Sequence, residues 1–121
     1  MKHSGTPHEL GRLGEEIALQ YLQSKGYRIA EKGFRLPIGE IDIIAYDKDT
    51  LVFVEVKARM QTGLGLPEES VTPKKQEQIR KVASGYLARH DLEDVACRFD
   101  VISLTFNDTG SHTLSHLVDA F

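Results

Sequence analysis

Three charged residues that could do chemistry together lie on two neighbouring segments of the chain: Asp42, Glu55 and Lys57. Two carboxylates 4 Å apart repel by roughly 4 kcal/mol at an effective dielectric of about 20. A cation between them would remove this cost. Lys57 could supply the charge, and so could a divalent ion such as Mg²⁺, which prefers carboxylate and water oxygens. The spacing therefore predicts a polar site if the fold brings the three residues together.

A β-hairpin is the element that must position them. The segments 39–46 and 51–57 are rich in β-branched and aromatic residues and flank a polar turn at 47–50, which is typical of paired strands. Alternation puts Ile41 and Ile43 on one apolar face. Counting outward from the turn gives the pairs Tyr46–Leu51, Ile44–Phe53, Asp42–Glu55 and Glu40–Lys57. A slip by one residue would mix the two faces, so this register fits best.

The charged end of this hairpin has two interpretations. It could be the solvated face of an ordinary amphipathic hairpin. However, Ile44, Leu51 and Phe53 share the face with the charges, so that face should be covered near the turn and open only at the charged end. A polar notch on a covered sheet is more typical of a site.

Composition indicates a single globular domain without a strong basic field. The 121 residues are 40% hydrophobic and 27% charged, with a formal net charge of −3, so nucleic-acid binding would need a local basic patch. We expect a flexible tail at 1–7 and one domain at 8–121. The single cysteine, Cys97, excludes an intramolecular disulfide and favours a reducing cytoplasm. No signal peptide or membrane-spanning stretch is found.

The remaining elements predict the fold class. We expect helices at 8–25 and from Thr72-Pro73 onward, and further strands at 27–35, 97–106 and 111–118, with Gly33 as a bulge and a long loop at 58–70. This order predicts an α/β sandwich, with a mixed central β-sheet of about five strands flanked by two main helices.

Both predicted helices carry polar residues at the margin of their apolar stripes. Glu15 could reach the notch of the sheet, or could be a solvated acid near the positive helix N-terminus. Lys75 and Gln76 should point toward the sheet. The second helix is the most basic element, with Lys74, Lys75, Arg80, Lys81 and Arg89. This face is either simply solvated or contacts phosphates.

Two smaller features of the last strands are expected to be structural. Arg98 and Asp100 can form an ion pair within one strand. His112 and His116 have the spacing of helical metal ligands, but their segment does not have a helical pattern, so we expect both at the surface.

The motif as a whole resembles a known superfamily. An Asp on one strand followed by Glu-x-Lys on the next, here Asp42 with Glu55-Val56-Lys57, resembles the restriction-endonuclease-like superfamily. The match sharpens to the YraN family of small bacterial proteins, thought to be related to archaeal Holliday-junction resolvases. The stretches that carry this resemblance are Gly14-Glu15, Gly39-Glu40-Ile41-Asp42, Phe53 to Lys57, Val71-Thr72 with Lys75-Gln76, Arg98 to Val101, and Asp119-Ala120-Phe121. The superfamily's usual proline before the motif aspartate is replaced by Ile41.

The resemblance implies a metal site and a set of roles. Asp42, Glu55, the Val56 carbonyl and Glu15 would hold Mg²⁺ or Mn²⁺. Lys57 would orient a water molecule or stabilise negative charge. Gln76 would contact the scissile phosphate or that water, and Lys75 is a less specific candidate for the same role. The nucleic acid would be bound by Lys74, Lys75 and Arg59.

Three functions follow as alternatives. The first is a metal-dependent endonuclease acting on branched or damaged DNA, recognised by structure rather than sequence. The second is a nucleic-acid-binding module without catalysis, and the third is a protein-interaction domain that keeps the fold. A homodimer is compatible with the resolvase-like relatives, although no residue marks its interface.

Overall fold

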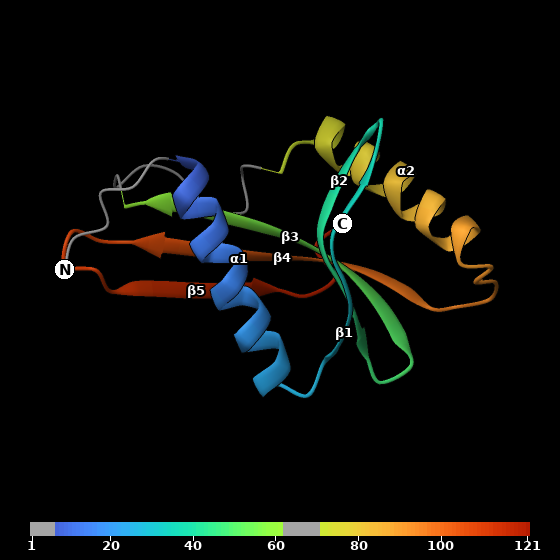
Figure 1. Ribbon diagram of the computed structural model, residues 1–121, viewed down its shortest axis with the longest axis horizontal. Helices are drawn as coiled ribbons and strands as arrows, with labels where there is room; N and C mark the ends of the chain where they lie inside the picture. The colour runs from blue at the N-terminus through green and yellow to red at the C-terminus, as the bar shows by residue number, and fades with distance from the viewer. Residues whose placement is uncertain (1–6, 62–70) are drawn as a thin grey trace.

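The computed structural model describes residues 7–61 and 71–121 as an α/β fold (Figure 1). Its elements are α1 (Pro7–Ser24), β1 (Arg28–Leu36), β2 (Gly39–Asp47), β3 (Thr50–Met60), α2 (Pro73–Arg89), β4 (Cys97–Phe106) and β5 (His112–Leu117). The strands form one sheet in the order β1-β2-β3-β4-β5. β3 and β4 are parallel and the other neighbours are antiparallel. The predicted mixed sheet with two helices is confirmed.

The two helices cover opposite faces of the sheet. Val52 and Val54 of β3 pack in the apolar core under α1. Leu51 and Phe53, which alternate with them, pack in the core under α2. Because successive strand residues point to opposite faces, the two cores lie on either side of β3. The central strand is therefore buried on both sides up to the charged residues.

The ends of both helices follow from local sequence. After α1, Gly26 has a φ of 90°, and its N–H and that of Tyr27 donate to Gln23 and Leu22, the pattern of a glycine-terminated helix. At the start of α2, Thr72 accepts a hydrogen bond from the Lys75 N–H at 3.2 Å. This bond satisfies an otherwise unpaired helix N–H group.

Three sequence expectations need correction or fall outside the described residues. The loop predicted at 58–70 starts later, because β3 continues to Met60, paired with β4; residues 62–70 lie outside the described ranges. The bulge of β1 lies between Ile29 and Glu31 and not at Gly33, although Gly33 has a φ of 63°. Of the tail predicted at 1–7, only Pro7 is described, as the first residue of α1.

Neither described helix is both long and apolar enough to cross a bilayer.

Close packing of α1 on the sheet depends on Gly14. A Cβ atom added there would lie 2.7 Å from the Cβ of Ala58 and 3.5 Å from a methyl group of Leu104. Gly11, one turn earlier, has no neighbour within 4 Å of such an atom. The two glycines that the helix contains thus differ in purpose, since only Gly14 permits close approach.

Gly14→Ala is therefore expected to destabilise the fold by about 1–3 kcal/mol, because the added methyl group overpacks the helix–sheet contact. Gly11→Ala is the matched control and is expected to stabilise by up to about 1 kcal/mol, since alanine favours the helix. Urea denaturation of the two variants measures both effects. Equal effects of the two substitutions would contradict this account of the packing.

Candidate active site

Asp42 lies where β2 separates from β3. The ladder between these strands follows the predicted register from Asp47–Thr50 to Ile43–Val54 and then stops. At the next position the Asp42 carboxylate, at Oδ2, accepts the Val56 N–H at 2.8 Å. A side chain thus takes over a bond that the neighbouring backbone would otherwise make. The predicted backbone pairs Asp42–Glu55 and Glu40–Lys57 are not part of the described ladder.

The separation also changes which way β2 faces. Ile41 packs under α2 and Ile43 under α1, although strict alternation predicted the same face for both. Ile44 returns to the α2 side. The strand therefore twists at Asp42 as β2 and β1 turn away from β3 past α2 (Figure 1). Asp42 sits at this twist, with access to both the sheet and α1.

Glu55 is the buried acid of the site. Its side chain is 7% exposed, and its Oε2 atom lies 3.6 Å from the Lys57 Nζ and 3.7 Å from the Lys75 Nζ. The two lysines are about one-third exposed and come from β3 and α2. The structure thus brings Glu55 and Lys57 together as predicted, and confirms that Lys75 points toward the sheet.

Glu15 reaches the site from α1. It lines a pocket of about 250 Å³ with Asp42, together with Arg12, Glu16, Leu19, Lys32, Gly33 and Ile43. Burial, followed by the charges of Glu40 and Glu55, raises the pKa of Glu15. Glu40 was not among the predicted site residues. Its position on the same strand, two residues before Asp42, was the signal that could have identified it.

The carboxyl group of Asp42 is held in its protonated form near neutral pH. Burial raises its pKa to about 8, with further contributions from the charge of Glu55, hydrogen bonding to Glu55 and the charge of Glu15. The hydrogen bond from Val56 acts in the opposite direction. Two acids that interact in this way, one buried and one half-buried, cannot both ionise at low cost without a cation. Lys57 and Lys75 lie next to Glu55 and offset its charge. Among the described residues, no lysine or arginine offsets the charge of Asp42 in this way, so its ionised form stays unfavourable.

The oxygen atoms at Asp42 are of the type that binds a hard cation, but there are few of them. In a strand, the N–H and C=O of one residue point to the same side, so the Val56 carbonyl faces the side from which its N–H reaches Asp42. Asp42, Glu55 and this carbonyl are oxygen donors of the class that Mg²⁺ and Mn²⁺ prefer. Within 7–61 and 71–121, no three His, Cys, Asp or Glu side chains are arranged to hold a metal ion. The residues fit an ion held by two carboxylates, a carbonyl and water.

Three further residues were predicted for the site: Gln76, Lys74 and Arg59. Gln76 is half-buried and donates through Nε2 to the Val71 carbonyl at 3.1 Å. Lys74 is exposed beside Lys75 at the start of α2. Arg59 is half-buried and pairs with Thr105 in the β3–β4 ladder. The catalytic role of Gln76 and the DNA-binding roles of Lys74 and Arg59 stay predictions.

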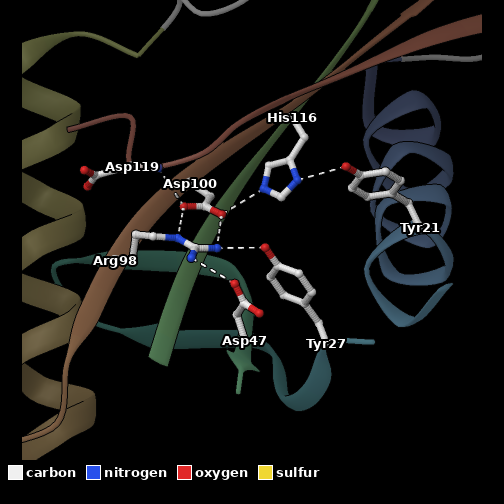
Figure 2. A network of polar contacts seen from close by, with 7 residues as sticks. All are labelled: Tyr21, Tyr27, Asp47, Arg98, Asp100, His116 and Asp119. Atoms are coloured by element: carbon white, nitrogen blue, oxygen red, sulfur yellow. Dashed lines mark hydrogen bonds and ion pairs between the residues drawn. The ribbon is translucent and has the colours of Figure 1, made fainter. Parts of the chain in front are cut away.

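A second polar cluster surrounds Asp100 on the α1 side of the sheet (Figure 2). Asp100 is fully buried, and its carboxylate binds Arg98 at 2.9 and 3.0 Å and the His116 Nε2 at 2.8 Å. It also accepts the Asp119 N–H at 3.0 Å. The predicted Arg98–Asp100 ion pair is confirmed.

His116 corrects the expectation that both histidines lie at the surface. Its side chain is 9% exposed, and its Nδ1 bonds the hydroxyl of Tyr21 at 3.0 Å. His112 is exposed as expected. Alternation in β5 carried the signal, because His116 shares a face with Leu114, which packs against the core.

This second cluster holds several segments of the chain together. Arg98 also binds Asp47 at 3.0 Å and the Tyr27 hydroxyl at 2.7 Å. The network therefore ties together the β2–β3 turn, the chain after α1, β4, β5 and the C-terminal segment (Figure 2). Burial alone would raise the pKa of Asp100, but the hydrogen bonds from His116, Arg98 and Asp119 hold it below its usual value. Asp100 is thus a satisfied buried anion.

Removing the Asp100 charge is expected to be costly. Asp100→Asn removes the buried negative charge that Arg98 and His116 share and puts an amide in its place, so the free energy of unfolding should fall by about 3–5 kcal/mol. The control is Asp47→Asn, at the exposed margin of the same network, which should cost about 1 kcal/mol or less. Urea denaturation at pH 7 compares the two. A small effect of Asp100→Asn would show that the network does not hold the fold.

The raised pKa of Asp42 predicts a pH dependence of stability in metal-free buffer with EDTA. Between about pH 4 and pH 8 the folded chain keeps the Asp42 proton that the unfolded chain has lost, so stability falls as pH rises. The slope from this group is at most about 1.4 kcal/mol per pH unit. Asp42→Asn retains an oxygen for the Val56 N–H but does not titrate, so its slope should be shallower. Identical slopes for both proteins, measured by urea denaturation, would contradict the assignment.

Comparison with known proteins places this arrangement in a family. A family model described as "Uncharacterised protein family UPF0102" matches residues 14–104. A UPF0102 protein of Geotalea daltonii is 48% identical over 112 residues, covering 93% of this chain and 88% of the relative. One from Chlorobium limicola is 48% identical over 120 residues, covering 95% and 93%. The match spans α1 from Gly14 through most of β4, and with it both carboxylates. The chain therefore belongs to the uncharacterised family UPF0102, which is the YraN family that its motifs had indicated.

Proposed function

We propose that this protein is a metal-dependent endonuclease that hydrolyses phosphodiester bonds of branched or damaged DNA. The observation that carries the proposal is the meeting of Asp42 and Glu55 beside Lys57 and Lys75, with the pKa of Asp42 raised to about 8. A structural ion pair would not leave one acid in this state. A divalent cation would relieve the repulsion between the acids and lower that pKa.

The roles of the residues follow from their positions. Bound Mg²⁺ or Mn²⁺ would activate water at neutral pH and offset charge on the phosphate. Asp42, Glu55 and the Val56 carbonyl would hold it, and Glu15, which lines the same pocket as Asp42, would complete its shell from α1. Lys57, about one-third exposed next to Glu55, would stabilise negative charge on the phosphate as it is attacked.

The charge distribution supports a nucleic-acid substrate. The chain as a whole carries a net charge of −3, yet the N-terminal turns of α2 present Lys74 and Lys75 next to the acidic site. A local basic surface beside an acidic pair is suited to holding a phosphate next to a divalent cation bound by the acids. Lys74, Lys75 and Arg59 would contact the DNA backbone.

A binding module without catalysis is the second candidate. The observation in its favour is that no three acidic, His or Cys side chains of the described residues are arranged as a metal site. In this case the fold would bind DNA through α2 while the lysines alone neutralise Glu55.

Cleavage and metal binding can be tested together. Purified protein is incubated with supercoiled plasmid and with a four-way DNA junction, in Mg²⁺ or Mn²⁺. We expect cleavage by the wild type and a loss of roughly 100-fold or more in Asp42→Asn and Glu55→Gln, because each removes a metal ligand. Mn²⁺ at about 100 times its Kd should also stabilise the wild type by about 2.7 kcal/mol and the two variants much less.

Asp49→Asn, an exposed acid in the β2–β3 turn, is the matched control and should behave as wild type. Equal cleavage by wild type and Asp42→Asn would overturn the catalytic assignment. Binding of the junction without cleavage and without stabilisation by Mn²⁺ would favour the binding module.

A further inference from the structure

A second hollow lies beside the candidate active site, between the tip of the β1–β2 hairpin and the first turns of α2. It has a volume of about 470 Å³ and is lined by Ile38, Thr72, Lys74, Lys75, Glu77, Gln78 and Lys81. The hairpin extends past α2 in Figure 1. The hollow combines three ammonium groups with one carboxylate, that of Glu77, which lies 3.5 Å from the Lys81 Nζ, and with one apolar wall.

The apolar wall is unusual for its position. Ile38 is one of the few large apolar side chains with high exposure among the described residues, at 48%, and it stands in the turn between two strands. Turn residues are normally polar or small. The tip is also held in place, because the Gln78 side-chain amide donates to the Ile38 carbonyl. Because Ile38 is exposed, held in place and next to lysines, this surface is suited to a partner that is both apolar and anionic.

The hollow adjoins the candidate active site through Lys75. Lys75 lines it and also lies 3.7 Å from Glu55. Ile38 precedes Asp42 by four residues, which in extended chain spans about 13 Å. A ligand in the hollow would therefore lie next to the carboxylates without covering them.

We infer that this hollow binds a nucleotide flanking the cleaved phosphate, with its phosphate on Lys74 and Lys81 and its unstacked base or sugar against Ile38. The inference deepens the proposed function and rests on it for the identity of the substrate. The positive charge of the lysines matches a phosphodiester backbone. Ile38 offers an apolar contact to the face of a base, which is open in unpaired DNA and covered by stacking in a duplex. The hollow thus selects DNA with splayed or unpaired strands.

The test measures binding in EDTA, so that it does not depend on cleavage. The probes are a fluorescent duplex with splayed single-stranded arms and the same duplex fully paired, followed by anisotropy. Ile38→Ser should weaken binding of the splayed probe by about 3–10-fold, because it removes apolar surface that the base would bury, and change the paired probe less than about twofold. Lys74→Ala should reduce the slope of log K against log salt by about 0.7–0.9, the value for one phosphate contact.

Matched controls are available elsewhere on the chain. Val118→Ser removes an equally exposed apolar side chain, also 48% exposed, and Lys25→Ala removes an exposed lysine at the end of α1. Both should bind like the wild type. If Ile38→Ser weakens both probes equally, or no more than Val118→Ser does, the inference is overturned. The same holds if Lys74→Ala leaves the salt slope unchanged.

These outcomes separate the inference from the proposed function. Loss of splayed-probe binding in Ile38→Ser supports the hollow even if the wild type cleaves no DNA. Cleavage by the wild type, with unaltered binding by Ile38→Ser and Lys74→Ala, overturns the hollow and leaves the nuclease standing. A wild-type chain that binds neither probe in EDTA overturns the inference, and the cleavage assay with Mg²⁺ or Mn²⁺ then decides the proposed function alone.

Discussion

The hydrogen bond from the Val56 N–H to the Asp42 carboxylate is the interaction on which the site depends. At this point the backbone ladder of β2 and β3 ends, and a side chain satisfies the strand in its place. A buried N–H without a partner would be costly, so the opening of the sheet requires an acceptor here. The same bond fixes Asp42 close to Glu55, where burial and the like charge of Glu55 keep the Asp42 carboxyl group protonated. The hydrogen bond that satisfies the strand therefore also places Asp42 where its ionised form is unfavourable.

Much of the fold could be predicted because it depends on local patterns. The hairpin register from Tyr46–Leu51 to Ile43–Val54 follows from the length of the turn and from alternation, and the structure has it. The N-cap at Thr72 and the stop at Gly26 depend on single residues with strong conformational preferences. These signals lie within a few positions of the feature that they determine.

The exceptions arise where distant segments meet. The twist at Asp42 occurs because β1 and β2 pack onto α2, and alternation in one strand contains no information about that neighbour. The burial of His116 depends on Asp100 and Tyr21, which are 16 and 95 residues away. The bulge in β1 falls between Ile29 and Glu31, where no glycine marks it. The helix patterns predicted that Lys75 points toward the sheet, whereas its ion pair with Glu55 could be seen only once the helix was placed.

The parallel pairing of β3 with β4 has a consequence for how the chain folds. Leu51 is opposite Cys97 and Met60 is opposite Phe106, so each contact joins residues 46 positions apart (97 − 51 and 106 − 60). Such distant pairings form slowly, because a long loop must close before any contact is gained. The β2–β3 hairpin, whose contacts are local, has no such delay. On a ribosome, Glu55 would therefore be synthesised well before β4, the strand that pairs alongside it, and the sheet around Glu55 would be completed only after β4 had emerged.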